Sequence, residues 1–237
     1  MLNAISNFLK LFKKKNMRVE ILGEVDGYPI LFVNSRNPKS GASRLVAGGF
    51  HGNEPAGVLA ILIYLESERL DPNLSFLPLV NPTGMFINTR NNVYKQDPNR
   101  GYCHKMGNLS KEGEILMNSS NKLVEASVDG FLSLHEDIDL KQFYLYSFEK
   151  ASEPGDFSKS LALTAGKLCP VLPNSNLYGD NVESGIILNE CDGSFEDYLF
   201  HSGSVRTACT ESPGALALDV RIKANIALIK AFSSFEQ

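Results

Sequence analysis

The sequence has 237 residues, 43% of them hydrophobic, which suits one globular domain that buries roughly three quarters of its unfolded surface. The formal net charge of -4 and an isoelectric point near 5.6 exclude the broad basic face that nucleic-acid binding requires. The four cysteines follow no paired spacing, which indicates reduced thiols rather than a disulfide framework.

The first 16 residues are expected to form an amphipathic helix or a tail. Their apolar residues precede their lysines, the reverse of a secretory signal, so we expect no cleavable signal and a cytoplasmic protein. Such a helix suits contact with a membrane or a partner, but a terminal helix that is docked on the protein or frayed is the favoured interpretation. No apolar run reaches the ~20 residues of a membrane span.

The rest of the chain alternates between β-rich and helix-like stretches. Strands are predicted at 18–23, 29–35, 44–50 and 75–81, with a helix at 55–69. Residues 82–113 are polar and rich in Asn and Gly, so we expect a long functional loop there. Then follow a helix at 112–127, strands at 128–135 and 143–149, a helix at 157–168, a strand at 185–190, a short helix from Ser194, a strand at 205–211 and a helix at 215–232. This alternation predicts an α/β fold, with three α/β/α layers around a mixed sheet and a single domain over 1–237.

Two histidines end predicted strands, and a glutamate accompanies the first of them. His51 and Glu54 follow an apolar strand that ends in two glycines, and His135 ends the strand at 128–135. Side chains on such strand ends can converge on one metal ion. A His, Glu and His set leaves a fourth position for water, as a catalytic zinc site requires. His104 and His201 are expected to be ordinary surface residues.

Four separated segments resemble, in the same order, those of the zinc metallocarboxypeptidases of the A/B type, in their short bacterial branch. They are HGNE at 51–54, NPTGMFINTRNN at 81–92 with DPNRGY at 97–102, LHED at 134–137 and TESPG at 210–214. The resemblance spans most of the chain, and the ordered set is specific although no single segment is. It implies a carboxypeptidase-like fold and one Zn²⁺ ion held by His51, Glu54 and His135.

The same resemblance assigns roles to four further residues. Glu211 would act as the general base that takes a proton from the zinc water and hands it to the leaving amine. Arg90 would polarise the scissile carbonyl and stabilise the oxyanion. Asn99 and Arg100 would bind the terminal carboxylate of a peptide-like substrate, a task that suits the fork of a guanidinium. The implied activity is hydrolysis of the C-terminal amide bond of a peptide.

The segment CDGSFEDYLF at 191–200 is expected to form the wall of the specificity pocket. Phe195 would favour an apolar terminal side chain, whereas Glu196 or Asp197, if it points inward, would favour a basic residue or a diamino acid. Both acids also suit the first turn of a helix, near its positive end. Pancreatic-type enzymes carry a mobile tyrosine, for which Tyr178 and Tyr198 are the candidates here.

Three alternative functions stay open at this point. Murein peptide amidases are similarly short and resemble the GSFEDY and TACTESPG segments. Aspartoacylase and succinylglutamate desuccinylase are similar around HxxE and DxNR, but they typically add a β-rich domain where only one helix follows Glu211 here. A noncatalytic zinc- or peptide-binding module is the third alternative, and the presence of all three ligands with Glu211 favours an enzyme over it.

Overall fold

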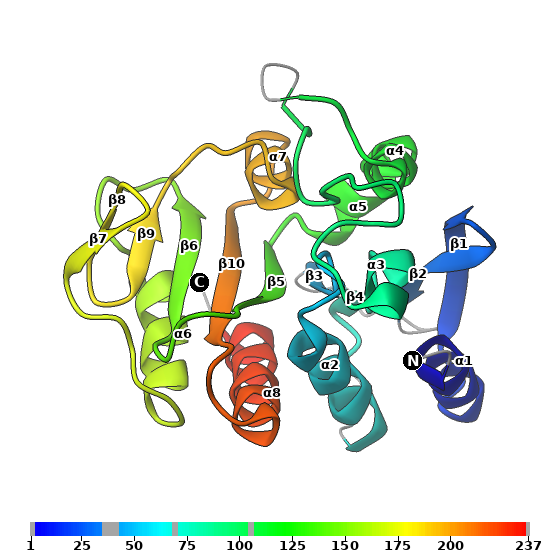
Figure 1. Cartoon of the computed structure of the whole chain (residues 1–237), viewed down its shortest axis with the longest axis horizontal. Helices are drawn as coiled ribbons and strands as arrows, with labels where there is room; N and C mark the ends of the chain where they lie inside the picture. Colours follow the sequence, from blue (N-terminus) through cyan, green and yellow to red (C-terminus); the bar gives the residue numbers. More distant parts are fainter. Residues whose placement is uncertain (1–2, 35–42, 68–70, 104–106, 236–237) are drawn as a thin grey trace.

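The computed structural model describes residues 3–34, 43–67, 71–103 and 107–235. It is built on an eight-stranded mixed sheet with the order β1-β2-β4-β3-β5-β10-β6-β9 (Figure 1). These strands are β1 (Arg18–Val25), β2 (Tyr28–Asn34), β3 (Arg44–Gly48), β4 (Leu74–Leu77), β5 (Gly130–Asp137), β6 (Tyr144–Glu149), β9 (Ile186–Leu188) and β10 (Arg206–Pro213). The strands β4, β3, β5 and β10 run parallel to their neighbours in this central part. Antiparallel pairs join β1 to β2, β2 to β4 and β10 to β6.

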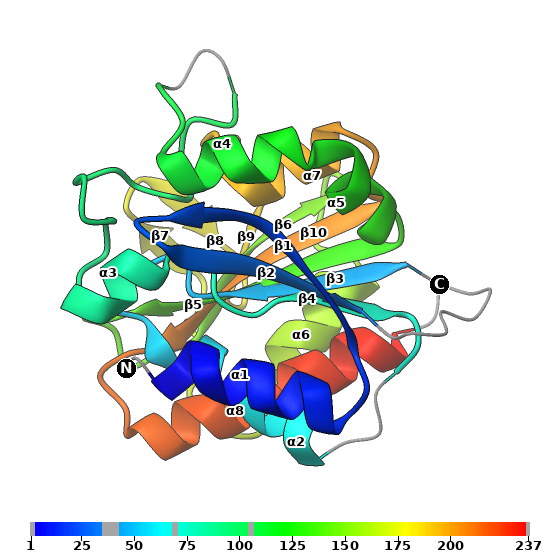
Figure 2. The same cartoon turned by 90° about the vertical axis from the view of Figure 1, so that its right-hand side faces the viewer.

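Helices cover both faces of the sheet, which confirms the predicted three-layer α/β/α fold (Figure 2). One face carries α1 (Asn3–Lys14), α2 (Pro55–Ser67), α6 (Asp156–Gly166) and α8 (Leu218–Ser234). The other carries α4 (Lys111–Asn118), α5 (Ser120–Ala126) and α7 (Phe195–His201). Two buried apolar clusters fill the space between the sheet and these helices, one on each face.

The N-terminal helix docks on the protein body, in line with the favoured interpretation of the sequence. Phe8 and Phe12 stack on each other in the core beside α2, while Lys13 and Lys14 end the helix. Within the described part of the chain, no helix is long and apolar enough to cross a membrane.

The expectation of one long loop at 82–113 is wrong in part, because α3 (Pro82–Ile87) lies inside it. The side chain of Asn81 accepts a hydrogen bond from the amide of Gly84, and Pro82 occupies the first turn, so local capping starts this helix. It is too short to show a helical period in the sequence. The predicted helix at 112–127 is likewise divided into α4 and α5 at Ser119.

A small hairpin of β7 (Ser175–Leu177) and β8 (Asp180–Val182) was not predicted, since three-residue strands leave no periodic signal. The other predicted helices and strands are present, with ends that shift by a few residues. The positions of the predicted helices, strands and loop that lie outside the described residues are Met1, Leu2, Ser35, Glu68, Arg69, His104, Lys105 and Met106.

Candidate active site

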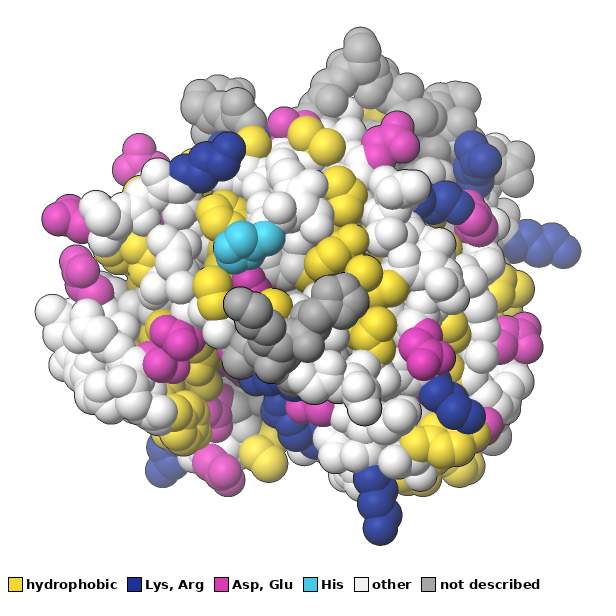
Figure 3. All heavy atoms as spheres, turned by 90° about the horizontal axis from the view of Figure 1, so that it is seen from above, with side chains coloured by type: hydrophobic (Ala, Val, Ile, Leu, Met, Phe, Trp, Pro, Cys, Tyr) yellow, Lys and Arg dark blue, Asp and Glu magenta, His cyan; other side chains and the backbone are white. Residues whose placement is uncertain are grey.

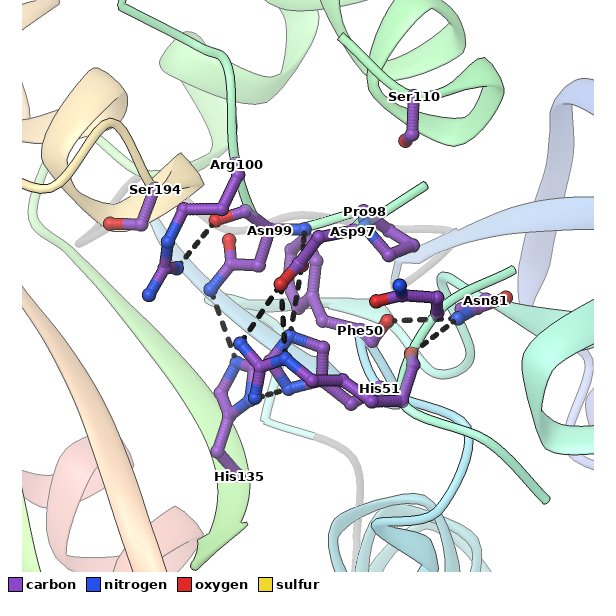
Figure 4. Close-up of polar contacts among 12 residues, drawn as sticks. Phe50, His51, Asn81, Asp97, Pro98, Asn99, Arg100, Ser110, His135 and Ser194 are labelled. Carbon is purple, nitrogen blue, oxygen red and sulfur yellow. Dashed lines mark hydrogen bonds and ion pairs between the residues drawn. The ribbon is translucent and has the colours of Figure 1, made fainter. Parts of the chain in front are cut away.

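The three predicted metal ligands meet at the carboxyl ends of the adjacent parallel strands β3 and β5. Glu54 directly precedes α2. His51 follows β3 and His135 lies near the end of β5, and the two imidazoles lie side by side (Figure 4). All three side chains are buried. In open α/β sheets this edge is where ligands bind, because the loops that follow neighbouring parallel strands converge there.

The loop that carries His51 needs glycine to pass close to α3. A Cβ atom on Gly52 would lie 1.9 Å from the backbone carbon of Gly84, so no other residue fits without moving that helix. Gly49 adopts a φ of +67°, a conformation that L side chains rarely take. The HGNE turn is therefore fixed by backbone packing.

The donor atoms of the three ligands fit one metal ion. The Nδ1 atom of His51 lies 2.8 Å from Glu54 Oε1 and 3.1 Å from His135 Nδ1, which is itself 2.9 Å from Glu54 Oε2. Tetrahedral zinc with bonds of about 2.0–2.2 Å separates its ligands by roughly 3.3 Å, close to these spacings. Two imidazoles and a carboxylate are also a donor set that catalytic zinc sites use. The residues present thus fit a divalent metal.

The charge balance within this group favours an ionised Glu54. Burial by itself would raise the pKa of Glu54, but the neighbouring His51 and His135 outweigh it and lower that pKa to about 2. The carboxylate is therefore ready to bind a cation at any moderate pH.

Each histidine has a carboxylate near its second ring nitrogen. His51 Nε2 lies 3.1 Å from Asp97 Oδ1, and His135 Nε2 lies 3.6 Å from Glu196 Oε1. A carboxylate behind a metal-binding imidazole fixes the ring and its tautomer. The sequence interpretation assigned no role to Asp97, although the DPNR segment contains it.

Glu211 stands beside His135, since the two residues are register partners in the parallel pair of β10 and β5. The loss of water around its carboxylate raises the pKa of Glu211 to about 8, with Glu54 and Asp137 adding repulsion. A cation bound at the adjacent ligands would lower that pKa again. A carboxylate whose pKa lies near neutral pH is well suited to act as a general base.

A pocket opens beside the ligands, and every residue with a role predicted from the sequence lines it, except Glu54, Phe195, Asp197 and the two candidate tyrosines. Phe195 is instead fully buried in the core, in an edge-to-face contact with Phe131 at a ring distance of 5.5 Å. The prediction that Phe195 shapes the pocket therefore has no support in this geometry. An apolar residue at the start of a buried helix and one in a pocket wall look alike in a sequence.

The two arginines of the site are half-exposed and each pairs with an acid. Arg90 Nε donates to Asp97 at 3.0 Å, and its guanidinium lies 4.0 Å from Glu54. Arg100 lies 3.0 Å from Asp192. Both guanidinium groups lie at the pocket, where a carbonyl or a carboxylate of a ligand could replace part of these contacts.

Asn99 and Glu196 form a buried unit at the back of the pocket. The amide of Asn99 donates to Glu196 Oε2 at 3.0 Å and accepts from the backbone N–H of Phe195 at 3.0 Å. Ser133 also donates to Glu196. Burial would raise the pKa of Glu196, but the contact with His135 lowers it to about 2, so this carboxylate is ionised. Both side chains are already engaged within the protein.

Of the two acids that the sequence suggested for this wall, Glu196 lines the pocket and Asp197 does not, and two further acids line it as well. Glu190 and Asp192 line it, whereas Asp197 accepts from Gly193 N and pairs with His201. Tyr146, Phe148 and Cys209 complete the wall. Their positions depend on β6 and β10 lying side by side, and this pairing has no local sequence signal.

The two candidate tyrosines lie outside the pocket lining. Tyr178 is 71% exposed and donates to Asp137 at 3.0 Å, while Tyr198 packs against Tyr102 and Phe195. Tyr146 is thus the tyrosine that the structure places in the pocket.

The chain is similar in sequence and structure to solved metallopeptidases, although no protein-family model and no curated protein matches it. A candidate metallopeptidase from Shewanella baltica is 36% identical, with 98% of this chain and 91% of that chain covered and a TM-score of 0.93. A metallo-carboxypeptidase from Burkholderia cenocepacia is 14% identical and shares the fold, with a TM-score of 0.71 over 96% of this chain and 66% of that one. Murein-tripeptide amidase from Escherichia coli O157 is 15% identical, with 92% of each chain covered and a TM-score of 0.63. With 36% identity over 98% of its length, the chain belongs to the same metallopeptidase family as the Shewanella protein, and its fold is carboxypeptidase-like.

Proposed function

We propose that the protein is a zinc-dependent metallocarboxypeptidase that hydrolyses the C-terminal amide bond of a peptide or peptide-like substrate. The observation that carries this proposal is the convergence of His51, Glu54 and His135 beside Glu211 and a pocket with two arginines. One Zn²⁺ ion at the three ligands would supply a Lewis acid and lower the pKa of a water molecule.

We assign the remaining steps of the hydrolysis to side chains of the pocket. Glu211 would take a proton from the attacking water and return it to the leaving amine. Arg90, within reach of Glu54, would donate to the oxygen of the scissile carbonyl as charge develops there. Arg100 would bind the terminal carboxylate of the substrate. Asn99 would hold Glu196 and the start of α7 in place, because its side-chain amide donates a hydrogen bond to Glu196 and accepts one from the N–H of Phe195.

A murein peptide amidase is the second candidate, and one observation favours it. Glu190 and Asp192 line the pocket beside Arg100, and such acids would bind the ammonium group of a diamino acid while the arginine binds its carboxylate. An N-acyl amino acid amidohydrolase lacks a comparable observation, since no cation other than the arginines lines the described pocket to receive a second carboxylate.

The test is release of free amino acids from peptides that end in Phe, Leu, Lys, Arg or diaminopimelate, with N-acetylaspartate and N-succinylglutamate in the same panel. We expect release from peptides by the zinc-loaded protein, its loss with a chelator, and a decrease of orders of magnitude in kcat for Glu211→Gln. Glu125→Gln, an exposed carboxylate on α5, is the matched control and should keep wild-type turnover.

Each other outcome would change the assignment. Release from the acylated acids alone would place the protein among the amidohydrolases. No release by zinc-loaded protein, with ligand binding unchanged in Glu211→Gln, would instead support a noncatalytic binding module.

A further inference from the structure

A group of side chains of the types that bind metals lies outside the pocket, along α7 and the loop before it. It consists of Cys191, Asp197 and His201, whose donor atoms all lie within 4.8 Å of one another. From this geometry we propose a second cation site, which binds zinc or another thiophilic divalent metal through these three side chains. The site is separate from the His51, Glu54 and His135 group and shares no residue with it.

The helix presents two of the ligands on one side. Asp197 and His201 are four residues apart in α7, which places them one above the other, and Asp197 Oδ1 lies 2.8 Å from His201 Nδ1. Cys191 approaches from the loop before the helix. A tetrahedral zinc ion separates its nitrogen and oxygen ligands by roughly 3.3 Å and its sulfur ligand by slightly more, so small rotations complete the site.

The surroundings leave these donors accessible. Cys191 is exposed and the His201 side chain is 59% exposed, so both can turn toward a cation at little cost. An imidazole is visible near acidic atoms on the face of the molecule seen from above (Figure 3). Asp197 is better fixed, because its Oδ2 accepts from Gly193 N at 3.0 Å while Oδ1 faces His201. The carboxylate of Asp197 is held in place, and the thiol of Cys191 and the imidazole of His201 can rotate, so the three side chains can bind one cation.

The donor types decide which metals fit. A thiolate, an imidazole and a carboxylate suit zinc, copper or cobalt, whereas magnesium and calcium require oxygen donors. Three protein ligands leave a fourth position for water or a small anion. A hydrogen bond is enough to explain the contact between Asp197 and His201. The additional thiol of Cys191 makes the three side chains a combination that is typical of metal sites.

Occupation of this site would act on the pocket through the chain that joins the two. Cys191 adjoins Asp192, whose carboxylate holds Arg100 at 3.0 Å, and Ser194 lines the pocket as well. A cation that ties Cys191 to α7 would fix the loop between them. We therefore expect metal at this site to change the KM for a carboxylate substrate more than kcat.

Cobalt titration of the full-length protein tests the site directly, because a thiolate bound to Co²⁺ gives a charge-transfer absorption band in the near ultraviolet. The His51, Glu54 and His135 group contains no sulfur, but the thiol of Cys209 lies beside His135. Every titration is therefore done in the Cys209→Ser background, where the first site gives no such band. We expect the band in this parent variant and in His51→Ala, and its loss in Cys191→Ser. In His201→Ala the Co²⁺ concentration at half-saturation should rise at least tenfold, because loss of even an outer partner of a metal ligand typically lowers metal affinity by about 10–100-fold.

Cys103→Ser is the matched control, since Cys103 is also exposed and should leave the band unchanged. Thermal unfolding of metal-free Cys191→Ser and metal-free His201→Ala should equal that of the wild type, because both replaced side chains are exposed. Absence of the band in the parent variant, its persistence in Cys191→Ser, its loss in Cys103→Ser, or unchanged affinity in His201→Ala would each overturn the proposal. None of these readouts requires turnover, so they stand apart from the test of peptidase activity.

Discussion

Replacement of Arg221 by Met should both destabilise the protein and weaken its metal site. Arg221, on α8, forms an ion pair with Glu136, whose side chain is completely buried next to His135. The other oxygen of Glu136 accepts from the N–H of Ala56 at 2.6 Å, and the Glu136 N–H donates to Glu54 at 3.2 Å. Glu136 thus joins α8 to the start of α2 through its carboxylate, and it contacts a metal ligand through its backbone N–H.

The magnitude follows from what Arg221→Met leaves behind. Removal of one partner of a buried pair costs about 3–5 kcal/mol, because the other charge stays buried without compensation. The Arg221 side chain is 15% exposed, so we expect the lower end, about 3 kcal/mol. A shift of the ligands that Glu136 holds should also lower metal affinity by about 10–100-fold.

The assays are urea denaturation of the metal-free protein and competition with a chelator for the metal. Lys223→Met on the same helix is the matched control, since its pair with Asp219 is exposed and its loss should have little effect. The double variant Glu136→Gln with Arg221→Met should be more stable than Arg221→Met alone, because no unpaired charge remains. A single variant no less stable than Lys223→Met would refute the reasoning.

Three further predictions concern single residues. Asp97→Asn should lower metal affinity by about 10–100-fold, because it weakens the partner of His51 Nε2, and equal affinity in chelator competition would contradict this. Phe195→Ala should lower the free energy of unfolding by about 3–5 kcal/mol and leave the preferred terminal residue unchanged, as a buried core residue requires; altered preference in the peptide panel would instead place it in the pocket. Since Glu211 has a folded-state pKa of about 8, above its unfolded value, its stabilising contribution is present at low pH and is lost as the pH rises through 8. The metal-free wild type should therefore lose more stability than metal-free Glu211→Gln between about pH 5 and about pH 9, and equal losses in urea denaturation would speak against this assignment.

The sequence predicted most of the architecture because the buried strands and amphipathic helices have clear periods. It also placed His51, Glu54 and His135 at strand ends, where the structure brings them together. The elements it missed are short: α3 depends on the Asn81 cap, and the β7–β8 hairpin has three-residue strands. Local capping and turn contacts determine such elements, and periodicity does not report them.

The sequence also could not predict the direction in which side chains point. The sequence could name Phe195, Glu196 and Asp197 as pocket candidates, but the rotation of α7 sends Phe195 into the core and Asp197 toward His201. The pocket acids Glu190 and Asp192 come from the loop before that helix. Which residues face a cavity depends on tertiary packing between distant strands, and a single sequence does not encode this locally.

The measurement that tests the central claim most directly is anomalous diffraction at the zinc edge from crystals of the zinc-loaded protein. The account predicts an anomalous peak about 2.0–2.2 Å from Nδ1 of His51, Nδ1 of His135 and a carboxylate oxygen of Glu54, and loss of this peak in His135→Ala. Zinc bound only elsewhere, or no peak at these three side chains in crystals that contain zinc, would contradict it.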